Sequence, residues 1–155
     1  MVDPMCIAGL YEASNCGVKI ELIIRGICCL VPGVPGLSEN ITVRSIVGRY
    51  LEHSRIYYFF NNGNEEVYLS SADLMQRNLD GRVETAFEVQ DPKLKNNLIN
   101  NILHPYLKDN TKARMLNSSM EYSLLQPVED EKKFNIQEWL MKHAEKAASK
   151  VKKVK

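Results

Sequence analysis

Apolar and polar residues alternate along several short stretches in the first half of the chain. Such alternation predicts β-strands, because successive side chains of a strand point to opposite faces of a sheet. Strands are expected over residues 18–24, 41–47, 55–60, 67–70 and 82–89, with a further extended piece over 113–116. The strands over 55–60 and 67–70 are expected to form a hairpin, because Asn61-Asn62-Gly63-Asn64 between them is a strong turn signal.

Helical patterns precede and follow these strands. Residues 3–15 predict a helix, since Asp3 can cap its start, Pro4 suits its first turn and Gly17 lies just past its end. Asp91-Pro92 opens a second helix that runs to about residue 107. Its apolar positions recur at helical spacing: Leu94, Leu98, Ile102 and Tyr106. Helices that alternate with strands predict an α/β fold, with a mixed β-sheet flanked by helices.

The two ends of the chain differ from its centre. The chain opens on a helix with no strand ahead of it, so we interpret it as a domain truncated at its N-terminal side. Residues 130–155 are rich in lysine and predict a helix or frayed tail with a weak apolar stripe: Leu140, Ala144, Ala147 and Val151. Such a run is typical of a solvated helix end and also suits a polyanion. We therefore divide the chain into a partial domain over 1–117 and a C-terminal extension over 118–155.

The composition narrows the class of protein. Of 155 residues, 45% are hydrophobic and 25% charged, which is the balance of a soluble globular protein. The sequence has neither an apolar stretch of membrane-spanning length nor a signal peptide, so a cytoplasmic location is expected. The net charge of +1 gives no general attraction to nucleic acid or membrane, so any anion site must be local. Four cysteines lack the spacing of a zinc site or a disulfide framework, which predicts reduced thiols: Cys6, Cys16, Cys28 and Cys29.

A histidine enters the strand expected over 55–60, with an arginine two positions on. His53 and Arg55 should point to the same side, because side chains alternate along an extended chain. Imidazole can exchange a proton and guanidinium can grip oxygens, so the pair can handle a phosphoryl group. Arg25 follows the strand over 18–24 at its carboxyl end, where ligands gather in open α/β sheets. Taken alone, these residues also fit ordinary surface positions at strand ends.

Small and acidic residues follow the second hairpin strand. Ser70-Ser71-Ala72-Asp73 places hydroxyls and a carboxylate beside the strand of His53, and small residues let backbone N–H groups approach an anion. A polar run then leads into the strand over 82–89: Arg77, Asn78, Asp80, Arg82 and Glu84. Both stretches also fit a simple turn and a solvated loop. The sequence has no P-loop and no glycine-rich nucleotide fingerprint.

Together these residues resemble one half of the phospholipase D superfamily pattern, which is His-x-Lys, a Gly-Ser-x-Asn strand end and a later Glu. In this chain Arg55 replaces the lysine, Asp73 stands in the asparagine position and Phe60 occupies the place of the usual aspartate. The resemblance implies a phospholipase D-like mixed sheet flanked by helices. The departures argue against phosphodiester cleavage.

Longer stretches closely resemble the C-terminal region of the bacterial polyphosphate kinases that work through a phosphohistidine. They are Ile24-Arg25-Gly26-Ile27-Cys28-Cys29-Leu30, then Pro32-Gly33-Val34-Pro35-Gly36, then Ser45-Ile46-Val47-Gly48-Arg49-Tyr50-Leu51-Glu52-His53-Ser54-Arg55. The resemblance covers about residues 2–116 and does not extend past Ser118.

The resemblance implies an enzyme that moves the terminal phosphate of ATP onto inorganic polyphosphate, reversibly and with magnesium, leaving ADP. Arg25 and His53 match the family's ATP-contacting positions, which implies that Arg25 clamps phosphate and that His53 is a catalytic acid, base or hydrogen-bond donor. Arg55 is expected to be a further phosphate clamp. Ser71 and Asp73 are expected to shape the pocket and orient His53. No residue of the chain stands out as a ligand for magnesium or another metal.

In this family the histidine of a preceding domain becomes phosphorylated, and this chain has no second motif that would match it. The expected partners are therefore the preceding domains of the same enzyme, with ATP, ADP and polyphosphate. The parent enzyme is expected to be a homo-oligomer that can also associate peripherally with a membrane. The isolated piece is expected to be inactive. His104 and His143 are expected to be structural or solvent-facing.

Two other functions stay open at this point. One is a phospholipase D-like phosphodiesterase or nuclease whose site is completed by homodimerisation, each chain giving one histidine. The other is a non-catalytic domain that binds polyanions or assists assembly.

Overall fold

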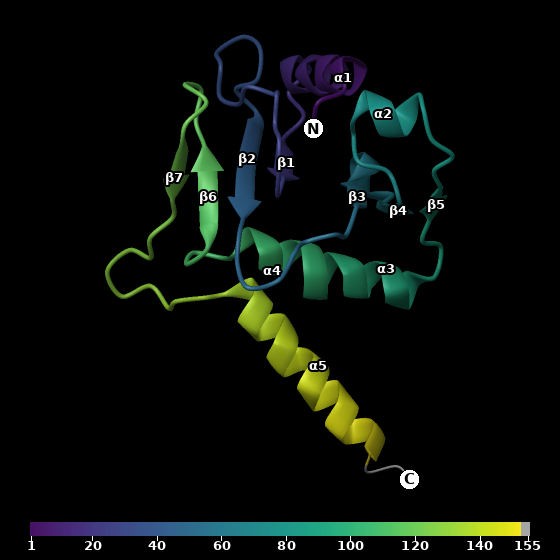
Figure 1. Cartoon of the computed structure of the whole chain (residues 1–155), viewed down its shortest axis with the longest axis vertical. Coiled ribbons are helices and arrows are strands. Elements are labelled where there is room, and N and C mark those ends of the chain that lie inside the picture. The colour runs from purple at the N-terminus through teal and green to yellow at the C-terminus, as the bar shows by residue number, and fades with distance from the viewer. Residues whose placement is uncertain (153–155) are drawn as a thin grey trace.

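The computed structural model describes residues 1–152. Their strands form two sheets that stand side by side (Figure 1). The larger sheet has the order β1-β2-β6-β7 and comprises β1 (Ile20–Ile23), β2 (Ile41–Ile46), β6 (Ala113–Leu116) and β7 (Tyr122–Leu124). β1 runs parallel to β2, whereas β2, β6 and β7 are antiparallel to their neighbours. The smaller sheet is an antiparallel array of β3 (Ile56–Phe59), β4 (Glu66–Ser70) and β5 (Ala86–Glu88).

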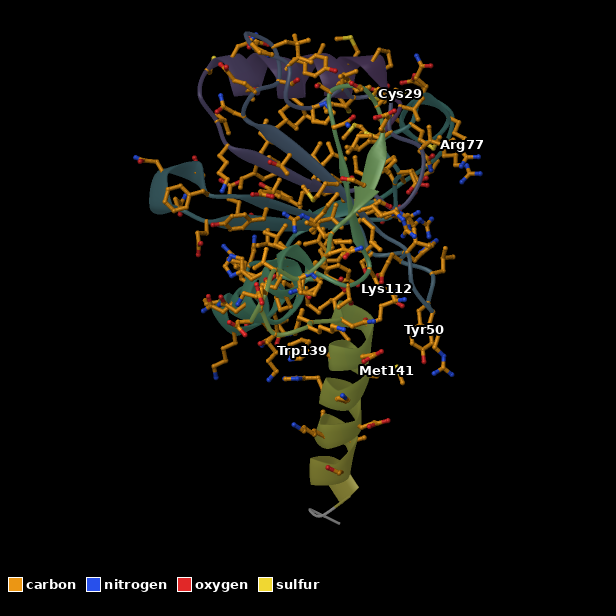
Figure 2. All side chains as sticks on the ribbon, turned by 90° about the vertical axis from the view of Figure 1, so that its left-hand side faces the viewer. Cys29, Tyr50, Arg77, Lys112, Trp139 and Met141 are labelled. Atoms are coloured by element: carbon orange, nitrogen blue, oxygen red, sulfur yellow. The ribbon has the colours of Figure 1, made fainter. Side chains whose placement is uncertain are left out.

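Helices lie toward the two ends of these strands (Figure 1). α1 (Pro4–Asn15) and the single turn α2 (Gln76–Leu79) lie at one end. At the other end runs a continuous helical rod made of α3 (Pro92–Leu98), the π-helical stretch η2 (Ile99–Leu103) and α4 (His104–Leu107). α5 (Ile136–Lys152) projects from the body of the molecule below Trp139 and Met141 (Figure 2). No helix among residues 1–152 is both long enough and apolar enough to span a bilayer.

The first helix forms as its end signals predict. The Asp3 carboxylate accepts a hydrogen bond from the Cys6 amide at 2.8 Å, which caps the helix, and Pro4 stands at its first position. Gly17 follows with a φ of +84°, a backbone conformation that favours glycine. The apolar side of α1 packs against one core cluster, whose buried members are Leu30, Ile41, Val43 and Leu116.

The hairpin and the long helical rod also form as expected. β3 pairs antiparallel with β4, and the turn η1 (Asn61–Gly63) places Asn62 at a φ of +52°. Asp91 caps the rod through two amides, and the rod ends at Leu107 as predicted. Its inner side packs against the small sheet through Ile99, which lies in a buried cluster with Val67 and Val89.

A third cluster joins α5 to the large sheet. Ile46 of β2, Ala113 of β6 and Ile136 of α5 are buried against one another. The Asp109 carboxylate, which is 1% exposed, accepts hydrogen bonds from the amides of Ala113 at 3.2 Å and Ile136 at 2.8 Å. The predicted C-terminal helix is therefore confirmed from Ile136 onward and is anchored at its start, while residues 153–155 lie outside the described residues. The division into 1–117 and 118–155 stays a prediction.

The expected α/β fold with mixed strand directions and flanking helices is confirmed, and its local details differ. The strands divide into two sheets, and β7 was not expected. The strand predicted over 82–89 is confined to β5. Ahead of it, the Ser71 hydroxyl bonds the Glu84 carboxylate and accepts from the Thr85 amide at 3.0 Å. Arg55, expected as the first residue of the strand over 55–60, precedes β3.

Candidate functional site

A pocket of about 420 Å³ lies between the two sheets. Its walls are β1 with the residues that follow it, the segment 52–57 that enters β3, the segment 73–75 that follows β4, and part of the helical rod. Four of the five predicted site residues line it: Arg25, His53, Arg55 and Asp73. Residues far apart in the sequence thus meet at one place, where the carboxyl end of β1 approaches the start of β3.

Arg55 is the centre of the polar side of this pocket. Its Nε and Nη2 donate to Asp73 Oδ1 at 3.0 and 2.9 Å, and its Nη1 donates to the His53 carbonyl at 2.8 Å. The Arg55 and Asp73 side chains are 16% and 32% exposed. The Asp73 carboxylate therefore fixes the orientation of the Arg55 guanidinium. Asp73 is linked to His53 only through Arg55. The prediction that Asp73 lies beside the His53 segment is confirmed, with Arg55 interposed.

The imidazole of His53 lies against the same guanidinium. Arg55 Nη1 is 2.9 Å from Nδ1 and 3.4 Å from Nε2 of the ring. One nitrogen comes this close to both ring nitrogens only when it lies against the ring rather than beyond one nitrogen in the ring plane. The guanidinium therefore stacks on the imidazole, and both ring nitrogens keep their in-plane directions open for other partners. The His53 side chain is exposed, so a ligand in the pocket can reach the ring.

Arg25 meets the same segment from the β1 side. Its Nη1 donates to the carbonyl of Glu52, the residue before His53. The side chain is exposed, and a guanidinium has five N–H donors, so this one bond leaves others for a ligand. The structure therefore brings Arg25, His53 and Arg55 to one pocket, with both arginines in contact with the chain at residues 52–53.

Glu52 is held at both carboxylate oxygens. Tyr106 of α4 donates its hydroxyl to Oε2, and Gln137 of α5 donates to Oε1 at 2.6 Å. Burial, together with the hydrogen bond to Glu52, raises the pKa of the Tyr106 hydroxyl. The hydroxyl therefore stays a proton donor at ordinary pH, and the orientation of Glu52 is fixed from two helices.

The Gln137 carboxamide also holds the backbone of the segment. Its Oε1 accepts from the Tyr50 amide at 2.9 Å, and its Nε2 donates to the Tyr50 carbonyl at 2.8 Å. Gln137 is 6% exposed, and it packs so closely on Gly48 that a Cβ there would stand 2.5 Å from its Oε1. Residues 48–52 have no strand or helix structure of their own, so these contacts set the path of the chain into His53.

These three supporting residues have no distinctive signal in the local sequence. Helical spacing marks Tyr106 only as an apolar position, and Glu52 and Gln137 are 85 residues apart. Arg77 of α2, which the sequence places in a polar run, also lines the pocket and extends outward (Figure 2).

Ser71 does not line the pocket. Its hydroxyl bonds Glu84, and the hydrogen bonds from Ser71 and Asn78 lower the pKa of that carboxyl. Ser71 therefore anchors the loop over 82–85, and the expectation that it shapes the pocket beside His53 finds no contact to support it.

The remaining candidate ligands are dispersed. His104 is exposed outside the pocket, and the His143 ring stacks on Trp139 at 4.2 Å between centroids. All four cysteines are free thiols. Within residues 1–152, no three His, Cys, Asp or Glu side chains gather closely enough to hold a metal ion.

The site thus belongs to a mixed α/β domain in which two arginines and a histidine converge beyond a strand end. Comparison with known proteins identifies the class. Residues 1–137 match the family model described as polyphosphate kinase C-terminal domain 2. The chain belongs to this family.

Relatives and a solved structure agree with that assignment. The polyphosphate kinase of Pseudomonas aeruginosa is 52% identical over 141 residues, which are 91% of this chain and 20% of that protein. The polyphosphate kinase of Burkholderia lata is 61% identical over 122 residues, which are 79% of this chain and 18% of that protein. The crystal structure of polyphosphate kinase from Porphyromonas gingivalis matches with a TM-score of 0.89 at 45% identity, covering 97% of this chain and 23% of that one. The chain therefore spans about a fifth of the length of these relatives.

Proposed function

We propose that this chain forms one side of the active site of a polyphosphate kinase, an ATP:polyphosphate phosphotransferase. The observation that carries the proposal is the convergence of Arg25, His53 and Arg55 on one pocket, in a chain of the polyphosphate kinase family. Three nearby groups that can grip or protonate phosphate oxygens suit a reaction in which charge moves between oxygens.

The reaction would proceed in two transfers. In the first, a histidine from a domain that this chain does not contain bonds to the terminal phosphorus of ATP, while the bond between that phosphorus and the bridging oxygen breaks and ADP leaves. In the second, the terminal oxygen of polyphosphate bonds to the same phosphorus, and the nitrogen–phosphorus bond breaks. The first step breaks a phosphoanhydride bond of ATP and the second forms one in polyphosphate, so the overall reaction would run in either direction, and the histidine is regenerated.

Arg25 would neutralise phosphate oxygens as charge builds on the leaving group. His53 would donate a hydrogen bond or a proton to the bridging oxygen of the leaving phosphate, and return as a base in the reverse direction. Arg55 would act chiefly on His53, because Asp73 already occupies two of its nitrogens. Asp73 would in turn be a positioning residue for Arg55.

Magnesium would enter with the nucleotide. Each carboxylate that lines the pocket already has partners: Asp73 pairs with Arg55, Glu21 pairs with Arg44, and Glu52 accepts from Tyr106 and Gln137. The described residues therefore do not fit a protein-held magnesium site, and the substrate would be the magnesium complex of ATP. Mg²⁺ is commonly held mainly by substrate phosphates and water.

A chimeric enzyme tests the proposal. This chain would replace the matching 141 residues of the Pseudomonas aeruginosa polyphosphate kinase, and ATP-dependent polyphosphate synthesis would be measured. The chimera should be active, His53→Ala should lower kcat by about a hundredfold or more, and His104→Ala should not. An active chimera that tolerates His53→Ala would remove His53 from the mechanism. An inactive, folded chimera would argue against a shared function and for a domain that binds polyanions without turnover.

A further inference from the structure

The C-terminal helix α5 belongs to a lysine-rich run that the proposed phosphoryl transfer does not use. The match to the family model ends at Gln137, in the first turn of α5, so the rest of the helix lies beyond the residues that define the family. Over residues 142–155 the sequence has six lysines and a single acidic residue, Glu145. The function of this charge is therefore separate from what the family model describes.

The outer turns of α5 stand clear of the rest of the molecule. Figure 1 shows the helix leaving the body, with no other labelled element beside its outer turns, and Figure 2 shows the same from the side. Lys142 and Lys146 are exposed, and they lie on one side of the helix because they are four residues apart. Both ammonium groups are therefore open to a ligand in solution.

These two lysines have no counter-charge from the described part of the protein. Glu138 precedes Lys142 by four residues and Glu145 follows it by three. Even so, among residues 1–149 no carboxylate oxygen lies within 4 Å of the Nζ atom of Lys142 or Lys146, whereas two other lysines of the chain do form such pairs. An anion that binds the two ammonium groups therefore breaks no ion pair of this protein.

The helix dipole does not account for the positions of these lysines. A cation stabilises a helix through the dipole chiefly within the last turn. α5 runs to Lys152, so Lys142 and Lys146 lie ahead of its last turn. Their charge is therefore available for another purpose.

A further cation connects the base of α5 to the pocket. Arg49 is exposed, and its guanidinium lies over the Tyr50 ring at 5.3 Å from the ring centroid. Gln137 of α5 holds both backbone groups of Tyr50 and also bonds Glu52, which lines the pocket. Exposed cations therefore occur in the pocket, at the base of α5 and along α5.

The side chains of α5 favour an inorganic polyanion over a nucleic acid or a membrane. Bases of single-stranded nucleic acids stack on aromatic rings, but the Trp139 ring already packs against Phe134 at 6.2 Å and His143 at 4.2 Å between centroids. Helices that lie in a membrane surface carry large apolar residues opposite their cations, whereas the apolar residues over 144–149 are three alanines. Charge is therefore the main feature that α5 offers to a ligand.

We infer that α5 is a second binding site for polyphosphate, separate from the pocket. The chain of phosphates lies along Lys142 and Lys146, and Arg49 continues the contact toward the pocket, where the reacting end meets Arg25 and His53. The helix holds the chain by charge between successive transfers. This inference rests on the proposed function, because polyphosphate is the substrate and product of the proposed reaction.

Polyphosphate binding by the 155-residue chain tests this site without ATP. Long-chain inorganic polyphosphate would be titrated at increasing salt concentration. The Lys142→Gln, Lys146→Gln double variant should bind about tenfold or more weakly at about 0.1 M salt, and the slope of log K against log salt should fall by about 0.7 for each lysine lost. The matched control is the Lys19→Gln, Lys93→Gln double variant, which removes the same charge from two other exposed positions and should leave binding unchanged.

Three results would overturn the inference. Equal weakening by the two double variants would show that net charge alone accounts for binding, and unchanged binding in the helix variant would show that α5 takes no part. Single-stranded RNA and vesicles of anionic lipid should compete much less strongly than polyphosphate at equal phosphate concentration. Competition of equal strength by either one would make α5 a nucleic-acid or membrane site instead.

The chimera with the Pseudomonas aeruginosa enzyme separates this inference from the proposed function. In an active chimera, the helix double variant should make shorter polyphosphate, because the chain dissociates more often between transfers, whereas the Lys19→Gln, Lys93→Gln control should not. Products of unchanged length from an active chimera with the helix variant would refute the inference alone. Helix-dependent binding by the 155-residue chain, together with an inactive chimera, would refute the proposed function and leave the binding site standing.

Discussion

The carboxamide of Gln137 donates to the Glu52 carboxylate across 2.6 Å and so joins the first turn of α5 to the residue before His53. The same carboxamide holds both backbone groups of Tyr50. The helix α5 projects from the body of the molecule, and the buried Gln137 lies at its base. Through this one side chain, α5 positions the segment that carries His53, the candidate catalytic histidine.

Replacing Gln137 by leucine should therefore disturb both stability and the site. Loss of its hydrogen bonds leaves the Tyr50 amide and one oxygen of Glu52 without their partner, which should cost about 1–3 kcal/mol in the free energy of unfolding. In the chimera, kcat should fall more than KM rises, because His53 loses its orientation. The exposed Gln126→Leu variant is the matched control and should change neither quantity. A wild-type kcat in a destabilised Gln137→Leu variant would show that the cluster is purely structural.

The Tyr106 hydroxyl should make stability depend on alkaline pH. Its pKa is raised in the folded chain, so the folded state keeps the proton after the unfolded state has lost it near its ordinary pKa of about 10. Its contribution is therefore complete below about pH 10 and declines as the pH rises further. Urea unfolding at about pH 8 and about pH 11 should show a smaller loss of stability in Tyr106→Phe than in the wild type. An identical loss in both proteins would contradict the assignment.

Asp73 should act on the site through Arg55. A double-mutant cycle with Asp73→Asn and Arg55→Gln should give a coupling of about 1 kcal/mol in unfolding, because the pair is partly shielded from solvent. In the chimera, Asp73→Asn should have little further effect once Arg55 is changed. Additive losses in kcat would instead mean that Asp73 contacts the substrate on its own.

The isolated chain should not synthesise polyphosphate from ATP, because the proposed nucleophile lies in another domain. The measurement is product formation by the 155-residue chain beside the chimera at equal concentration. Turnover by the isolated chain comparable with that of the chimera would mean that the chain carries a complete site.

Much of this site follows from short-range sequence patterns. The end of a strand places Arg25, and an extended motif places His53 and Arg55. The local sequence pattern therefore predicts that these residues project near the end of a sheet. The hairpin turn at Asn62 and the cap at Asp3 follow from residue chemistry in the same way. Such features depend on neighbours a few positions away.

The remainder depends on contacts between distant residues. Tyr106 and Gln137 reach Glu52 from 54 and 85 positions away, and nothing near either residue marks it as polar support for a histidine. The division into two sheets has the same origin, because alternation predicts that a strand exists but not which edges pair. The break at residues 82–85 arises where the Ser71 side chain bonds Glu84 and Thr85.

The most direct test of the account is the position of the covalent phosphate. The chimera would be labelled with ATP carrying radioactive phosphorus at its terminal phosphate, digested without acid, and the labelled peptide identified. We expect phosphohistidine outside the 155 residues of this chain, formed much more slowly in His53→Ala. Label on His53 itself would contradict the account, because His53 would then be the nucleophile rather than its partner.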